Sequence, residues 1–269
     1  MSKQAIGIFD SGIGGLSTLK PLRQLLPNED FIYVADMAFS PYGDKSQSIL
    51  TQRADAICEF LIKQDVKAIV IACNTATAAS IAELRQKLSL PIIGVEPGIK
   101  PASEQSLSGV AGILATGRTL SSAKFQTLLK QFSDKLTLLV QACPGLAEAI
   151  EEGELGVEKR ATLIHQYAEP LLKQGADTLV LGCTHYPLIA QEISQLLGSQ
   201  IRLIDTSEAI AKQVVVQLEN RQTLNSSKMP GKTYFYYSTE GHPYQHQTQE
   251  LNKLFSYYWG GEVTLEVLP

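Results

Sequence analysis

The sequence contains few thiols and few imidazoles, which limits the kinds of site that it can form. Its 269 residues include four histidines and four cysteines, the latter at positions 58, 73, 143 and 183. No CxxC pair occurs, and no pair of histidines accompanies the cysteines at the spacing of a zinc site. We therefore expect free thiols in a reducing compartment and no metal.

Long apolar runs and clusters of positive charge are missing as well. No stretch approaches the roughly 18 apolar residues that cross a bilayer, and the opening MSKQAIGIFDSG has neither the apolar run nor the cleavage site of a secretory signal. The net charge of -4, without a sustained Lys/Arg cluster, offers no electrostatic surface to duplex nucleic acid. We therefore expect a cytoplasmic protein that binds neither membranes nor nucleic acid.

The remaining composition is that of a folded protein with more than one lobe. Hydrophobic residues make up 44% of the chain and charged residues 19%, which is the ordinary range of a globular protein. A length of 269 residues exceeds the usual domain size of about 100 to 150 residues, so two compact lobes are expected.

Strand and helix patterns alternate along the chain. Residues 4–15 (QAIGIFDSGIGG) are typical of a buried strand that enters a glycine-rich turn, and residues 16–26 have the apolar spacing of a helix. Residues 67–73 (KAIVIAC) form a continuous apolar run, as in a parallel strand covered on both faces, and a helical pattern follows at 74–88. This alternation predicts an α/β fold with doubly wound, mainly parallel sheets.

The second part of the chain repeats this order. Gly112 and Thr116 in GVAGILATG fall where Gly7 and Ser11 fall in AIGIFDSG, at an offset of 105 residues. Residues 174–187 then match residues 64–77 at an offset of 110, which places a cysteine at the same strand end in both halves. A diverged duplication of an α/β half explains this pattern.

The duplication predicts two pseudo-symmetric lobes with the active site between them. We expect a discontinuous first lobe, residues 1–97 plus 208–269, and a second lobe at 98–207. Ligands of open parallel sheets bind beyond the carboxyl ends of the strands, which is where both repeated cysteines fall.

Polar residues follow each repeated cysteine. Asn74 and Thr75 follow Cys73 and can donate hydrogen bonds to a carboxylate at a helix N-terminus. Thr184 and His185 follow Cys183, and His185 can hold a proton or hydrogen-bond a thiol. A single buried cysteine is usually a small core residue, but two at equivalent strand ends favour a function. Cys58 and Cys143 lack such neighbours and are interpreted as core residues.

Two loops and one helix end hold further candidates, each with an ordinary structural alternative. Asp10 and Ser11 lie in the turn FDSGIGGLS, where they can contact a ligand or cap a helix. The glycines there do not form GxGxxG, so no nicotinamide cofactor is expected. The loop SPYGDKS can close over a small ligand or be a plain turn. Glu151 and Glu152 are typical of solvated charges at a helix end.

Five segments together resemble the glutamate racemase family of the aspartate/glutamate racemase superfamily. They are FDSGIGGLS, YVAD followed by PYG, ACNTAT, GVEPGIKPA and GCTHYPL, and the likeness spans the whole chain. The resemblance implies an isomerase that interconverts L- and D-glutamate without pyridoxal phosphate or metal. It also implies a supply of D-glutamate for peptidoglycan, the polymer that sets cell shape, and a homodimer.

The same resemblance implies roles for individual residues. Cys73 and Cys183 correspond to the catalytic acid and base of the family, and Cys73 is expected to deprotonate D-glutamate and Cys183 L-glutamate. Residues implied to assist the thiols are Asp10, Asp36, His185 and Glu151, with the adjacent Glu152 as the alternative to Glu151. Residues implied to contact substrate are Asp10, Ser11, Pro41, Tyr42, Gly43, Asn74, Thr75, Thr116, Thr184 and His185. Arg118 and Phe125 depart from the family pattern, which has glycine and tyrosine there.

Two thiols suit this reaction because inversion of a stereocentre needs a base on one face and an acid on the other. Two alternatives remain open at this point. A racemase of a related acid such as aspartate or a hydantoin would share both cysteines and differ in its pocket. A two-lobed protein that binds a small acid without turnover would leave both cysteines inert.

Overall fold

The computed structural model describes residues 3–239 and 248–269, which form two compact units. The second unit, Glu96–Thr206, is an insertion in the first, which consists of Met1–Val95 and Ser207–Pro269. Within the described residues, no helix is both long and apolar enough to cross a membrane.

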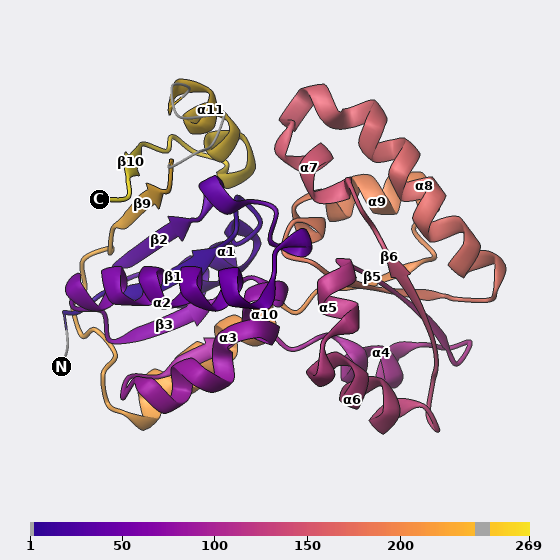
Figure 1. Cartoon of the computed structure of the whole chain (residues 1–269), viewed down its shortest axis with the longest axis horizontal. Helices are drawn as coiled ribbons and strands as arrows, with labels where there is room; N and C mark the ends of the chain where they lie inside the picture. Colours follow the sequence, from indigo (N-terminus) through magenta and orange to yellow (C-terminus); the bar gives the residue numbers. More distant parts are fainter. Residues whose placement is uncertain (1–2, 240–247) are drawn as a thin grey trace. The chain divides into compact units, whose positions relative to one another are not determined.

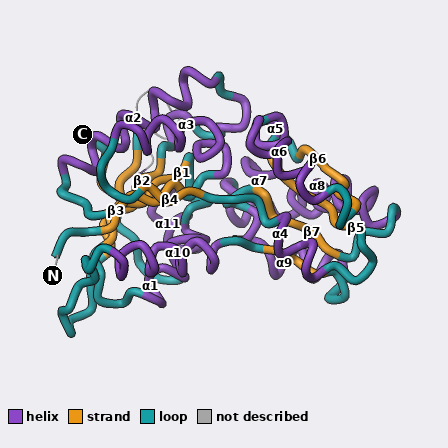
Figure 2. Tube along the Cα trace, turned by 90° about the horizontal axis from the view of Figure 1, so that it is seen from below, coloured by secondary structure: helices purple, strands orange, loops and turns teal. Residues whose placement is uncertain are grey.

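The first unit is built on a six-stranded sheet with the order β10–β9–β2–β1–β3–β4. Its strands are β1 (Ile6–Asp10), β2 (Phe31–Ala35), β3 (Ala68–Ile71), β4 (Ile92–Gly94), β9 (Thr233–Tyr237) and β10 (Leu265–Val267). Helices α2 (Gln47–Lys63) and α3 (Asn74–Lys87) lie on one face, and α1 (Leu16–Leu25), α10 (Ser207–Asn220) and α11 (Thr248–Trp259) lie on the other (Figure 2). Short 3-10 turns at Met37–Phe39 and Tyr42–Asp44 connect β2 to α2.

The core of the first unit follows from the alternation of side chains along these strands. Phe9 and Ile71 point to the α2 side, where Ile57 and Leu61 join them in one buried cluster. Tyr33 points to the opposite side and makes an edge contact with Phe255 of α11. Because both faces of β1, β2 and β3 are covered, these strands are apolar along nearly their whole length.

The second unit repeats the plan on a smaller scale, with the strand order β6–β5–β7–β8. Its strands are β5 (Val110–Ala115), β6 (Thr137–Ala142), β7 (Thr178–Gly182) and β8 (Arg202–Ile204). Figure 1 shows α4 (Ile99–Gln105), α5 (Gly117–Ser121) and α6 (Ala123–Phe132) on one side of the strands, and α7 (Leu146–Glu151), α8 (Val157–Lys173) and α9 (Ala190–Leu197) on the other. Short 3-10 turns at Gly153–Gly156 and Tyr186–Ile189 precede α8 and α9.

The register of the strands shows that the two units are copies of one plan. Gly7 pairs with Ile69 in the first sheet, and Gly112 pairs with Leu179 in the second. The offsets between these partners are 105 and 110 residues, the same two offsets as in the sequence repeat. Every described strand pairing is parallel. The predicted α/β class with two parallel, pseudo-symmetric lobes is therefore confirmed.

Each sheet has a switch point between its first and third strands. In the first unit the chain leaves β1 toward β2 on one side and leaves β3 toward β4 on the other, and the second unit does the same at β5 and β7. The carboxyl ends of these strand pairs are where open parallel sheets bind ligands. Cys73 follows β3 and Cys183 follows β7, so each unit has one thiol at its switch point.

Candidate active site

Cys73 is the N-cap residue of α3, and its buried thiol lies at the start of that helix. Its Sγ accepts a hydrogen bond from the Ala76 backbone N–H at 3.4 Å, and the thiol donates toward the Ser11 hydroxyl at 3.9 Å. A helix N-terminus favours negative charge on a group that caps it. Asn74 and Thr75, in the first turn of α3, are also buried. The first unit thus combines a thiol, a hydroxyl and helix N-terminal donors at one strand end.

Asp10 fixes the turn that carries Ser11. Its buried carboxylate accepts the Gly12 backbone N–H at 3.0 Å, and the Tyr33 hydroxyl donates to the Gly12 carbonyl at 2.6 Å. The turn is so close that a Cβ on Gly15 would lie 2.7 Å from the Asp10 Cβ and 2.8 Å from the Tyr33 hydroxyl, which leaves glycine as the residue that fits. The Asp10 carboxylate therefore has a structural role in the turn that carries Ser11, the residue that contacts the Cys73 thiol.

Asp36 organises the loop that carries Pro41, Tyr42 and Gly43. Its buried carboxylate accepts the Tyr42 hydroxyl at 2.5 Å and the Ser238 hydroxyl at 2.7 Å. Arg53 binds the same carboxylate with two hydrogen bonds, at 3.0 and 2.8 Å. Burial raises the pKa of Tyr42 well above its usual value, and Asp36 raises it further. The hydroxyl therefore stays protonated and donates a hydrogen bond to Asp36.

The second unit presents a chain of three polar groups, of which two are buried and the third is nearly so. The Cys183 Sγ lies 3.7 Å from His185 Nδ1, and His185 Nε2 lies 2.9 Å from a carboxylate oxygen of Glu151. The side chains of His185 and Glu151 are only 3% and 12% exposed, so water competes little with this pairing. Burial lowers the pKa of His185, but hydrogen bonds to Cys183 and Glu151 outweigh it and raise the pKa well above the usual value. The raised pKa favours the imidazolium form of His185, in which both ring nitrogens carry a proton and one faces the Cys183 sulfur while the other faces Glu151.

The structure separates the two adjacent glutamates that the sequence left as alternatives. Glu151 reaches His185, whereas Glu152 is exposed and binds Lys159 at 2.5 Å. Helix α7 ends at Glu151, so the two side chains leave the helix end in different directions. Geometry thus assigns Glu151, rather than Glu152, to the neighbourhood of Cys183.

Thr184 and Thr116 also lie in the second unit. Thr184 is buried next to Cys183. Thr116 follows β5 and caps α5, because its hydroxyl accepts the Thr119 backbone N–H at 3.2 Å. Of the two departures from the family pattern, Phe125 is fully buried in the core beneath β5, and Arg118 lies in the first turn of α5.

The two remaining cysteines lie in the core, as predicted. Burial raises the pKa of Cys58 to about 12 and that of Cys143 to about 12, so both stay protonated thiols. Within the described ranges, no group of three His, Cys, Asp or Glu side chains could hold a metal ion.

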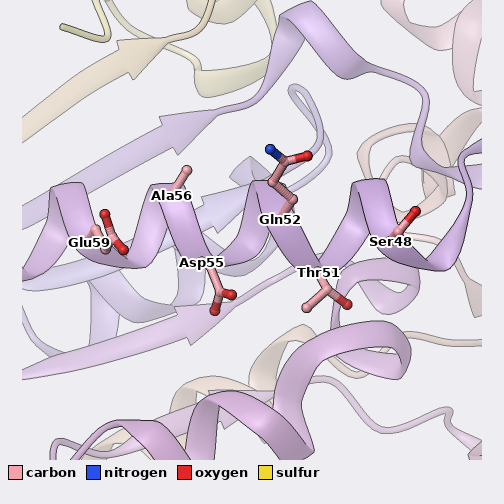
Figure 3. A pocket seen from close by; sticks show the side chains of 6 residues that line it. All are labelled: Ser48, Thr51, Gln52, Asp55, Ala56 and Glu59. Atoms are coloured by element: carbon pink, nitrogen blue, oxygen red, sulfur yellow. The ribbon is translucent and has the colours of Figure 1, made fainter.

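A hollow on the surface of the first unit is unrelated to these thiols. Figure 3 shows it along the outer face of α2, where its lining comprises Ser48, Thr51, Gln52, Asp55, Ala56 and Glu59. The lining holds no thiol and no imidazole, and Asp55 is engaged by Lys87 at 2.9 Å. The candidate thiols, Cys73 and Cys183, lie instead at the two switch points.

Sequence reasoning missed the residues that hold the candidates in place. Arg53 and Ser238 both bind Asp36, and Ser238 lies 202 positions away along the chain. A helix pattern gives no sign of which of its charged residues turns inward, and Ser238 follows a strand near the end of the chain. Only the fold brings these partners together.

Comparisons with known proteins identify the family of the chain. The family model described as Asp/Glu/Hydantoin racemase matches residues 19–214. A glutamate racemase of Ectopseudomonas mendocina (strain ymp) is 47% identical over 239 residues, which cover 88% of this chain and 90% of the relative. The crystal structure of a glutamate racemase isoform from Bacillus anthracis matches with a TM-score of 0.87 at 29% identity and covers 100% of this chain and 98% of that one.

A second solved structure extends the comparison to a complex. The Escherichia coli glutamate racemase, crystallised with L-glutamate and the activator UDP-MurNAc-Ala, matches with a TM-score of 0.84 at 31% identity and 98% coverage of both chains. The similarity therefore extends over nearly the whole chain, in sequence and in fold. The chain belongs to the Asp/Glu/hydantoin racemase family, within its glutamate racemase branch.

Proposed function

We propose that the chain interconverts L-glutamate and D-glutamate by moving the α-proton between Cys73 and Cys183. One observation carries the proposal: each unit of a duplicated fold has a buried thiol at the carboxyl end of its third strand. Cys73 has the helix N-terminus of α3, and Cys183 has the His185 imidazolium. The relatives that are glutamate racemases supply the identity of the substrate.

Two thiols account for inversion, since a single group would return the proton to the face from which it came. The proposal requires one thiol on each face of the α-carbon, one as thiolate base and the other as thiol acid. The roles exchange with the direction of the reaction. We assign Cys183 as the base toward L-glutamate and Cys73 as the base toward D-glutamate.

The carboxylates of glutamate need donors that neutralise the charge developing at the α-carbon. Candidate donors in the first unit are Ser11, Asn74 and Thr75, which surround the start of α3. Thr184 supplies a hydroxyl in the second unit. Fixed donors that need no rearrangement stabilise such a transition state. The other proposed substrate contacts are Asp10, Pro41, Tyr42, Gly43, Thr116 and His185.

The proposal extends to the setting of the enzyme. The chemistry needs no pyridoxal phosphate and no metal, because the thiols themselves exchange the proton. A cytoplasmic location, a homodimer and a supply of D-glutamate for peptidoglycan are carried over from the family resemblance. The proposed first lobe is residues 1–97 plus 208–269, and the proposed second lobe is 98–207.

Exchange of the α-proton with solvent deuterium tests the mechanism, starting separately from L- and D-glutamate without added cofactor. The unmodified chain should exchange and interconvert both. Cys73→Ala and Cys183→Ala should each abolish interconversion. Cys73→Ala should still exchange the α-proton of L-glutamate without inverting the α-carbon, because Cys183, the base toward L-glutamate, is retained. Cys183→Ala should likewise exchange the α-proton of D-glutamate without inversion, because Cys73 is retained.

Controls separate this mechanism from its alternatives. Cys58→Ala removes a buried thiol of the first unit that lies outside the proposed site, and it should leave interconversion intact. Exchange of aspartate in preference to glutamate would change the substrate. A chain that exchanges neither acid would refute the racemase proposal.

A further inference from the structure

The second unit contains a buried arginine that holds the chain on both sides of Glu151. Arg160, on α8, is 2% exposed. Its Nη1 donates to the Ala149 carbonyl at 3.5 Å and also to the Gly153 carbonyl. These two carbonyls lie two positions before and two positions after Glu151. The guanidinium therefore bridges the end of α7 at the residue that contacts His185.

Glu192, on α9, holds the other edge of the same guanidinium. Arg160 Nε donates to the two Glu192 carboxylate oxygens at 3.3 and 3.1 Å, and Nη2 donates at 3.0 Å. This is the forked pairing in which an arginine is most strongly oriented. The Arg160–Glu192 pair therefore connects α8 and α9 to the carboxyl end of α7.

The positive charge of the Arg160 guanidinium is favourable at the carboxyl end of α7. The last carbonyls of a helix have no partner within the helix, and they carry its negative dipole end. A buried guanidinium supplies both hydrogen bonds and positive charge to the end of α7, and Glu192 supplies the counter-charge that a buried cation needs.

The turn that follows α7 has no room to adjust. A Cβ added to Gly156 would lie 2.0 Å from the Ala149 carbonyl oxygen, which is the same oxygen that Arg160 contacts. The path of residues 149–156 is therefore fixed by close contact as well as by hydrogen bonds. Glu151 lies within this segment, with its carboxylate 2.9 Å from His185 Nε2.

We propose that Arg160 and Glu192 form a positioning pair that holds Glu151 against His185 and thereby controls proton transfer at Cys183. The inference rests on the proposed function for the reaction, and it adds two residues that act through Glu151. The pair lies wholly in the second unit, so it should affect the Cys183 half of the reaction and leave the Cys73 half unchanged.

The test compares Glu192→Gln and Arg160→Lys with Glu29→Gln. Glu29 forms a buried ion pair with Lys67 in the first unit at 2.5 Å, so its variant is a control for the loss of a carboxylate that is paired with a buried cation. In the Cys73→Ala background, Glu192→Gln and Arg160→Lys should slow α-proton exchange of L-glutamate by about tenfold or more, as expected for a misplaced catalytic group. In the Cys183→Ala background, the same changes should leave exchange of D-glutamate within about twofold, a limit that marks no loss of catalytic geometry.

A second readout does not depend on turnover. The chain has four histidines, so NMR of labelled histidine can follow His185 after assignment with a His185→Gln variant. Glu192→Gln and Arg160→Lys should lower the pKa of His185, because Glu151 then contributes less to its imidazolium form. Glu29→Gln should leave that titration unchanged.

The two readouts keep the proposals apart. If the unmodified chain does not racemise glutamate, the proposed function fails, while the His185 titration still tests the positioning pair. Folded Glu192→Gln and Arg160→Lys proteins with an unchanged His185 titration would overturn the inference. Equal slowing of the two half-reactions, or an equal effect of Glu29→Gln, would also overturn it, since it would reveal a general structural loss.

Discussion

At the scale of single residues, His185 lies between a thiol and a carboxylate that both favour its charged form. The contacts are 3.7 Å to Cys183 Sγ and 2.9 Å to Glu151. Tyr42 in the first unit is a contrasting case, because burial and Asp36 keep its hydroxyl neutral. Both side chains respond to burial first, and in each of them a neighbouring carboxylate adds to the rise in pKa.

The raised pKa of His185 makes part of the stability of the fold dependent on pH. Because the folded pKa lies above the unfolded value of about 6.5, this contribution is fully present below the unfolded pKa and is lost as pH rises through the folded pKa. The free energy of unfolding of the unmodified chain should therefore approach that of His185→Gln as pH rises across that window. Urea unfolding of both proteins at a series of pH values measures the difference. A difference that stays constant with pH would contradict the expected imidazolium.

Tyr42→Phe removes one donor from the buried Asp36 carboxylate. The lost hydrogen bond of 2.5 Å leaves a charged acceptor less satisfied, which should lower the free energy of unfolding by about 1–3 kcal/mol. Urea unfolding measures this change. Tyr257→Phe, at an exposed position, is the control and should change stability little. Equal effects of the two substitutions would mean that the hydroxyl contact with Asp36 contributes nothing specific.

At the scale of elements, a buried ion pair links the segment after α10 to the amino-terminal ends of β2 and β3 in the first sheet. Lys67, just before β3, binds Glu29, just before β2, at 2.5 Å, and both side chains are 2% exposed. Lys67 also donates to the Thr223 carbonyl at 2.8 Å, and Glu29 accepts the Asn225 backbone N–H at 2.7 Å. Two strands and a distant loop are thereby joined at one point.

Removing one partner of this pair should lower the free energy of unfolding more than removing both partners. Lys67→Met leaves the Glu29 carboxylate buried without its cation, and it should lower the free energy of unfolding by about 3–5 kcal/mol. The double variant Lys67→Met/Glu29→Leu removes the uncompensated charge and should recover most of that loss. Thermal and urea unfolding of the three proteins measure the cycle. A double variant less stable than Lys67→Met would show that the pair contributes more than charge compensation.

At the scale of the whole molecule, the duplication is the feature that the sequence predicts best. Buried parallel strands leave apolar runs, and the residues at their ends are of matching types, so Cys73 and Cys183 align from the sequence alone. The supports of the site are not predictable in this way. Arg160 resembles the other charges on an amphipathic helix, and its inward position depends on Glu192 of another helix. Glu151 likewise differs from Glu152 only by the direction in which α7 ends.

The inserted second unit has the features of an independently folding domain. Its sheet has a core of its own, in which Ile113, Phe125 and Val180 are fully buried. The chain also enters and leaves the unit at one place, since a Cβ on Gly98 would lie 2.7 Å from Ile204 and 3.2 Å from Thr206. Adjacent ends are typical of domains that tolerate insertion.

Residues 96–206 expressed alone should therefore fold, and they should unfold in urea in one cooperative transition followed by circular dichroism. The fragment keeps Cys183, His185 and Glu151 but lacks Cys73, so it should not interconvert the glutamate enantiomers. The His185→Gln change should destabilise the fragment with the same dependence on pH as in the full chain, because all of its contacts are local to the unit. A fragment without a cooperative transition would mean that the core beneath β5 depends on the first unit for its stability.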